Sequence, residues 1–103
     1  MKKIVNGKVY NTETATKVAS YSFSNQSDFH YYEETLYRTS KGSYFLTGEG
    51  GPLSHYAVSQ GNNTTSGSSA ITPLSDGEAL NWLEEHDFTE EIEKYFPDSI
   101  EEA

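Results

Sequence analysis

The pattern of apolar residues changes at Pro73, and no other feature of the sequence constrains the fold as strongly. Before Pro73, apolar and aromatic residues occur in short runs separated by turn-forming residues, which is typical of antiparallel strands. After Pro73, they recur every three or four residues, which is typical of amphipathic helices. In a chain of 103 residues, this order predicts a single α+β domain spanning residues 1–103. We expect a small antiparallel β-sheet of about four or five strands, followed by two short C-terminal α-helices.

Turn-forming residues place the strands of the first half. The pair Asn6-Gly7 is the strongest short signal for a two-residue hairpin, whose strands would be residues 2–5 and 8–10. Further along, we expect one helical turn at 11–15, a strand at 17–23, and a second hairpin with strands at 32–38 and 43–47.

Residues 48–69 are rich in glycine, serine and asparagine, and they predict a long loop of the kind that often carries a function. Within it, we interpret 48–51 as a tight turn and expect 53–59 to pack against the core. A short edge strand is expected at 70–72. Pro73 would end that strand, because proline cannot donate to a strand ladder.

The helical part begins with a clear start signal. Ser75 is followed three residues later by Glu78, which is a capping box, and Leu74 can pack on Ala79 one turn inside the helix. The first helix should therefore begin at Asp76. A second helix should follow, with Asp87 or Thr89 as its N-cap, an apolar face that includes Phe88, Ile92, Tyr95 and Phe96, and Pro97 as its end.

Charge is distributed very unevenly along the chain. The formal net charge is −9, yet residues 1–70 carry 6 basic and 5 acidic side chains, whereas residues 71–103 carry 11 acids against Lys94 alone. Helices that only need solvation usually interleave lysine with glutamate, so this surface gives up stability through self-repulsion. A partner that supplies the missing cations would account for it. The predicted partner-binding residues are Asp76, Glu78, Glu84, Glu85, Asp87, Glu90, Glu91, Glu93 and Asp98.

Composition also argues against several other functions. The chain has no cysteine, which removes disulfides, thiolate metal sites and cysteine nucleophiles. Its three histidines do not have a metal-ligand spacing, and Ser54 beside His55 lacks the glycine frame of a nucleophile elbow. We therefore expect no catalytic residue, no metal and no cofactor. The negative charge opposes direct binding to nucleic acid or to an anionic membrane. No targeting or membrane segment is seen, which makes a cytoplasmic location the default.

The densest cationic surfaces belong to proteins that bind nucleic acid, so the acidic helices could imitate a phosphate backbone. A duplex carries one charge per about 1.7 Å of its axis, and eight carboxylates fall between Ser75 and Phe96. At about 1.5 Å per residue, 22 helical residues extend about 33 Å. The number of charges per length of helix is thus lower than that of a duplex but of the same order.

Two segments resemble a family of small acidic proteins from bacterial phages and mobile elements. They are 9–15, reading Val-Tyr-Asn-Thr-Glu-Thr-Ala, and 36–51, which holds an Arg-Thr-Ser-Lys-Gly turn and a glycine-rich run. In that family a Pro-Leu pair and an acidic helix with a tryptophan follow, as Pro73-Leu74 and Trp82 do here. The positions that match the pattern are Tyr10, Arg38, Lys41, Gly42, Gly48, Gly50 and Gly51.

The resemblance implies an anti-CRISPR protein that acts without catalysis in the cytoplasm of a bacterial host cell. Its partner would be a Cas effector protein, blocked where it binds guide RNA or target DNA. The chain's Lys-, Asn-, Tyr- and Glu-rich composition suggests an AT-rich Gram-positive host, which slightly favours Cas9 as that effector. The alternative is an antitoxin-like or transcription-modulating protein of a mobile element, which would use the second hairpin and the 49–69 loop instead of the acidic helices. The expected partner is a Cas effector or another nucleic-acid-binding protein. The sequence leaves homodimerisation open.

Overall fold

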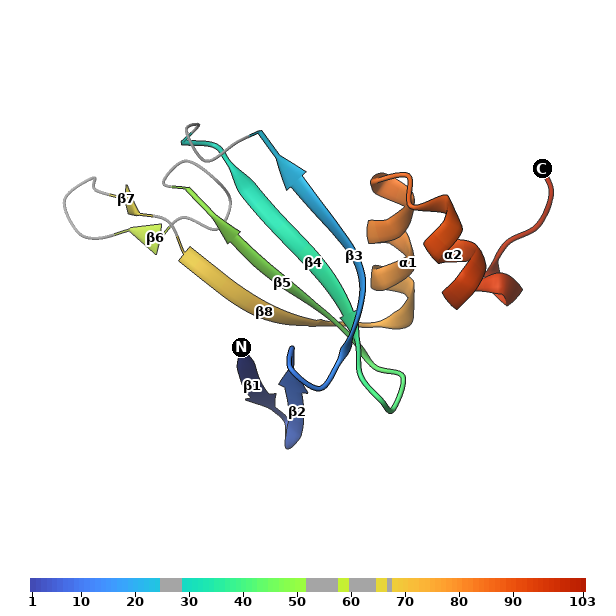
Figure 1. Ribbon diagram of the computed structural model, residues 1–103, viewed down its shortest axis with the longest axis horizontal. Helices are drawn as coiled ribbons and strands as arrows, with labels where there is room; N and C mark the ends of the chain where they lie inside the picture. The colour runs from blue at the N-terminus through green and yellow to red at the C-terminus, as the bar shows by residue number, and fades with distance from the viewer. Residues whose placement is uncertain (25–28, 52–57, 60–64, 67) are drawn as a thin grey trace.

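The computed structural model describes residues 1–24, 29–51, 58–59, 65–66 and 68–103. These residues form an α+β fold, as the sequence predicts (Figure 1). A four-stranded antiparallel sheet has the order β3-β4-β5-β8, and a separate hairpin, β1-β2, precedes it. Two helices follow the sheet. The strands are β1 (Lys2–Val5), β2 (Lys8–Asn11), β3 (Thr16–Phe23), β4 (Tyr32–Arg38), β5 (Tyr44–Gly50), β6 (Val58–Ser59), β7 (Thr65–Ser66) and β8 (Ser68–Leu74); the helices are α1 (Asp76–Glu85), α2 (Thr89–Tyr95) and the 3₁₀ turn η1 (Pro97–Ser99).

The first hairpin forms as its turn residues predict. Asn6 and Gly7 have φ angles of 51° and 76°, and two consecutive positive φ values are the requirement of a type I′ turn. The segment after it forms the expected single helical turn at 11–15. The backbone carbonyl of Asn11 accepts from the N–H of Ala15 at 3.1 Å, which is the bond of an α-helical turn, and its side-chain oxygen accepts from the N–H of Glu13 at 3.0 Å. The asparagine side chain thus caps this turn, and the chain then becomes extended in β3.

The glycine-rich end of the second hairpin differs from the prediction. Residues 48–50 continue β5 rather than forming a tight turn, with Gly48 paired to Glu34 on one side and to Ala70 on the other. Because β5 lies between two strands, hydrogen bonds on both sides hold these glycines extended despite their weak strand preference. Of the segment 53–59, which was expected to pack on the core, residues 53–57 lie outside the described residues.

The last strand lies at the edge of the sheet, as expected, but it is longer than 70–72. Pro73 lies inside β8, opposite Phe45, and does not end it. An edge strand has a neighbour on one side only, so a residue without an N–H can be accommodated when its nitrogen faces away from that neighbour.

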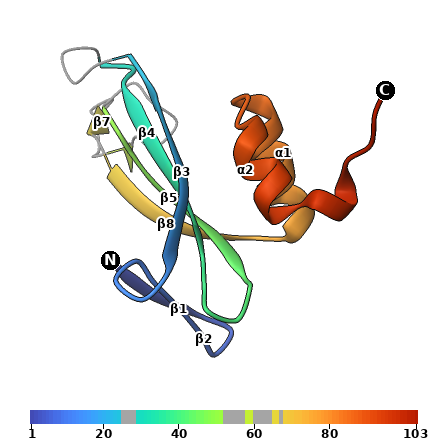
Figure 2. The same cartoon turned by 45° about the vertical axis from the view of Figure 1, so that its right-hand side comes forward.

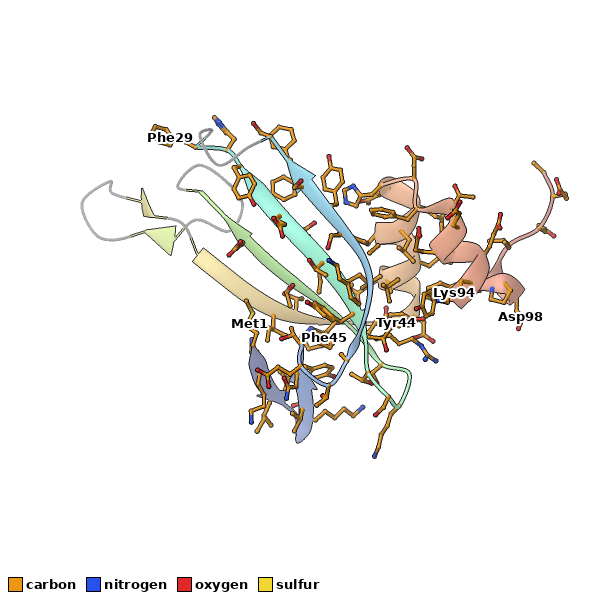
Figure 3. All side chains as sticks on the ribbon, viewed as in Figure 1. Met1, Phe29, Tyr44, Phe45, Lys94 and Asp98 are labelled. Carbon is orange, nitrogen blue, oxygen red and sulfur yellow. The ribbon has the colours of Figure 1, made fainter. Side chains whose placement is uncertain are left out.

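The two faces of the sheet pack against different elements. Tyr44 and Phe45 are consecutive in β5 and therefore point to opposite faces. Tyr44 lies toward α1 and α2, and Phe45 lies toward β1-β2 (Figure 3). Figure 2 shows both helices on one side of the sheet and the β1-β2 hairpin near the turn that joins β4 to β5. The main core lies between the sheet and the helices, with Leu36 and Leu83 fully buried in it.

Candidate functional site

The nine predicted acids lie on α1, on α2 and in the segments that follow each helix, and together they are called the acidic surface here. Eight of them are exposed, and Glu91 is half-buried. Since Lys94 is the single basic residue after position 70, these carboxylates face solvent with little local compensation. The ammonium group of Lys94 lies 5.3 Å from the centre of the Tyr95 ring, on α2 (Figure 3).

Helix α1 is fixed to the sheet by one buried polar contact and by apolar packing. The indole N–H of Trp82 donates to a carboxylate oxygen of Glu34 at 3.0 Å, and both side chains are buried. Ala79, Trp82 and Leu83 form the buried face of the helix. Glu84 and Glu85 lie in solvent beside this buried face, and Glu85 is close enough to Tyr32 of β4 to add to the effect of burial, which raises the pKa of that phenol.

Helix α2 is held by aromatic and aliphatic contacts. The rings of Phe96 and Tyr44 stack with their centroids 5.3 Å apart, and Ile92 is buried in the same core. Burial raises the pKa of the Tyr44 hydroxyl, and the nearby Arg38 opposes this rise. The polar side of α2, with Glu90 and Glu93, is left in solvent.

The junction between the helices is a Schellman motif. The N–H of Phe88 bonds to the carbonyl of Leu83 at 3.0 Å, and the N–H of Asp87 bonds to that of Glu84 at 3.2 Å. Asp87 takes a φ of 60° there, a position that usually holds glycine. It is therefore not the N-cap of α2. That position is held by Phe88, which makes no side-chain cap bond, so neither Asp87 nor Thr89 caps the second helix.

His86 ties this junction to the sheet. Its ring stacks on Tyr21 of β3 at 3.8 Å and meets the ring of Trp82 edge-on at 4.9 Å. The end of α1 is thus held by the backbone hydrogen bonds of the Schellman motif and by the ring contacts of His86. The backbone that carries the carboxylates of this junction is therefore fixed relative to the sheet.

The acidic surface falls into parts with different surroundings. Glu84, Glu85, Asp87 and Glu90 lie close to the α1-α2 junction, where all four are exposed within residues 84–90. Asp76 and Glu78 lie in the first turn of α1, about 9 to 14 Å along the helix axis from Glu84 and Glu85. Asp98 lies beyond α2, in η1 (Figure 3).

Glu78 has a structural role that sets it apart from the other acids. Its carboxylate accepts from the N–H of Ser75 at 2.9 Å, while the Ser75 hydroxyl accepts from the N–H of Glu78 at 3.1 Å. This is the predicted capping box, and the hydrogen bond from the Ser75 backbone lowers the pKa of Glu78. A substitution at Glu78 would change the helix start as well as the surface charge.

Two charged features were missed at the sequence level. The first is the buried carboxylate of Glu34, whose neighbours at every second position of β4 are Tyr32 and Leu36. Strand periodicity places these three on one face, so the alternation could have marked Glu34 as a core acid. The second is a groove beside the first hairpin, lined by Lys8 and Lys41.

The described residues contain no group of three His, Asp or Glu side chains that could hold a metal ion. Nor does any helix in this part of the chain have the length and apolar character needed to cross a membrane. Comparisons with protein-family models, with curated proteins and with solved structures find no significant match for the chain.

Proposed function

We propose that the protein is a non-catalytic anti-CRISPR inhibitor. It would bind a Cas effector, with Cas9 favoured, through the acidic surface and block the binding of guide RNA or target DNA. The observation that carries this proposal is the row of exposed carboxylates at the α1-α2 junction, fixed by the Trp82–Glu34 and Tyr21–His86 contacts. The choice of a Cas effector rests on the family resemblance described above.

Rigid presentation supports a binding role for these acids. Because the backbone that carries these acids is already held in place, a partner does not have to order it on binding, and complementary charge accelerates encounter with a cationic channel. Solvation of a helix face does not require so many carboxylates of the same sign, and their mutual repulsion lowers the stability of the fold. The half-buried Tyr95 on α2 could supply an aromatic contact beside the carboxylates.

The test is cleavage of a DNA target by purified Cas9, with the protein added either before or after the guide RNA. Inhibition only before guide loading would indicate competition for the guide channel. Inhibition after loading would indicate the target-DNA site. Added salt should weaken the inhibition in either case, because ions screen exposed charges over about 8 to 10 Å at moderate ionic strength.

A matched pair of variants tests the surface itself. Glu84→Lys with Glu90→Lys changes two exposed acids at the α1-α2 junction, while Glu13→Lys with Glu49→Lys makes the same net change on exposed acids of the turn after β2 and of β5. We expect the first variant to need at least about tenfold more protein for half inhibition, and the second to act like the parent. Equal losses in both would show that only net charge matters, and no inhibition by the parent protein would remove Cas9 as the target.

A further inference from the structure

Most basic residues of this acidic chain gather at one end of the sheet. Six of the seven lie within the first 41 residues. Lys2, Lys3 and Lys8 belong to β1-β2, Lys17 and Arg38 lie at this end of β3 and β4 on opposite faces of the sheet, and Lys41 lies in the turn between β4 and β5. Among the described residues, two acids lie near this end: Glu13, in the turn after β2, and Asp76, which lies close to Tyr44 together with Arg38. The lysines of the hairpin and of the β4-β5 turn are the part of this end that lies away from the acidic α1-α2 junction.

A groove of about 580 Å³ opens between the β1-β2 hairpin and the turn that joins β4 to β5. Both elements lie at the lower end of the sheet in Figure 1. Two lysines line the groove, Lys8 from the hairpin and Lys41 from the turn, and four hydroxyl side chains accompany them: Thr14, Thr39, Ser40 and Ser43. No lining residue carries a carboxylate.

The walls of the groove are held in place by contacts of their own. In the turn, the N–H of Thr39 bonds to the carbonyl of Ser43 at 2.8 Å, and the N–H of Ser43 bonds back to the Thr39 hydroxyl at 3.1 Å. On the hairpin side, Tyr10 is buried and its ring meets Phe45 of the sheet edge-on at 5.6 Å. The two lysines are therefore attached to structured backbone on opposite sides of one cavity.

We propose that this groove binds a small phosphate-bearing molecule of about nucleotide size. Ammonium groups and hydroxyls are the side chains that recognise phosphate oxygens, and here they line one groove that no carboxylate lines. The volume falls within the range of about 300 to 1,000 Å³ that is usual for small-molecule sites. A small ligand is favoured over a nucleic acid strand, because a long polyanion would also meet the repulsion of a chain that carries −9 overall.

The experiment is a titration of the ¹⁵N-labelled protein, followed by NMR, with ADP, inorganic pyrophosphate, adenosine and a short single-stranded oligonucleotide at low salt. We expect ADP and pyrophosphate to shift the amide signals of Val9, Ser40 and Ser43 in a saturable way, and adenosine to leave them unchanged. Binding by adenosine alone would overturn the proposal, since the phosphate would then play no part. So would an oligonucleotide that binds more tightly than ADP, or the absence of saturable shifts with either phosphate compound.

Matched lysine variants show whether the groove or only the positive field is responsible. Lys8→Gln and Lys41→Gln should each weaken ADP binding at least tenfold, while Lys2→Gln, on the same hairpin but outside the groove, should change it less than threefold. Equal losses in all three would mean diffuse attraction and would overturn the proposal. The Glu84→Lys and Glu90→Lys variant should keep this site whatever its effect on Cas9, so that the two proposals can fail separately.

Discussion

At the scale of single residues, the contact between Trp82 and Glu34 joins the helices to the sheet. It places a carboxylate in the core, where an indole N–H satisfies one of its oxygens. Buried polar groups are costly when unpaired, so the two side chains depend on each other. The exposed acids rely on this contact indirectly, because it fixes the helix that carries them.

Replacing Glu34 separates the hydrogen bond from the charge. Glu34→Ala should lower the free energy of unfolding by about 1 to 3 kcal/mol, because the Trp82 N–H loses its acceptor inside the core. Glu34→Gln keeps a carbonyl oxygen at the same place and should cost clearly less. Urea unfolding followed by tryptophan fluorescence measures both, and equal losses would show that the hydrogen bond contributes little.

Asp87 offers the opposite case, a residue whose backbone is strained. Its φ of 60° lies in the left-handed region, where glycine is favoured by about 1 kcal/mol over most residues. Its carboxylate also lies beside the negative end of the α1 dipole. Asp87→Gly should therefore raise the free energy of unfolding by about 1 kcal/mol. A fall in thermal stability would mean that the aspartate side chain makes a contact that outweighs the strain.

At the scale of elements, the start of α1 depends on the capping box formed by Ser75 and Glu78. Ser75→Ala removes the acceptor for the Glu78 N–H and should destabilise the protein by about 1 kcal/mol. Ser75→Thr, which keeps a hydroxyl, is the control. If alanine and threonine give the same unfolding midpoint, the box does not hold the helix start.

The same box gives the protein a pH-dependent contribution to stability. The pKa of Glu78 is lowered in the folded state by its hydrogen bonds to Ser75. This contribution is therefore complete above the ordinary pKa of glutamate and is lost as the pH falls through the folded value. Glu78→Gln should be less stable than the parent at pH 7, with the gap closing toward pH 3. Urea unfolding at both values tests this, and a gap that widens in acid would contradict the assignment.

Elements with strong local signals were predictable from the sequence, and the others were not. Asn6-Gly7 and the Ser75 capping box act through neighbouring residues alone, so the first hairpin and the start of α1 were correct. The extension of β5 through Gly48 depends instead on pairing with β8, which local propensity does not describe. The N-cap of α2 was wrong for a related reason, since Asp87 is used by the end of α1.

The candidate site was predictable in composition but not in geometry. Charge counting identified the acids, and it gave no indication that Glu91 would be half-buried or that Glu78 would be used by the helix start. The groove between Lys8 and Lys41 was missed because its walls lie 33 positions apart in the sequence. Only the tertiary packing of the hairpin on Phe45 brings them together.

At the scale of the whole molecule, the protein is extended for its length. Its radius of gyration is 15.2 Å, whereas about 13 Å is usual for a compact chain of about 100 residues. The hairpin and the helices pack on different faces of one thin sheet, which separates the lysines of the hairpin from the α1-α2 junction (Figure 2). Such a shape exposes much surface for binding and leaves a modest core.

Because the acidic helices repel themselves, salt should stabilise the folded protein. Raising sodium chloride from 20 to 500 mM should raise the urea midpoint of the parent, since the Debye length falls from about 20 Å to about 4 Å. Glu84→Gln with Glu90→Gln should be more stable than the parent at low salt and should respond less to added salt. An equal response in both would place the repulsion elsewhere in the molecule.

The proline in β8 has a consequence for self-association. An open sheet edge can recruit a strand from another chain and so begin aggregation. At Pro73 the outward side of this edge offers no N–H to an incoming strand, so a growing ladder would be interrupted there. The residue that looked like a stop signal for the strand thus acts on the chain's neighbours, because it discourages copies of the protein from joining edge to edge and forming fibres.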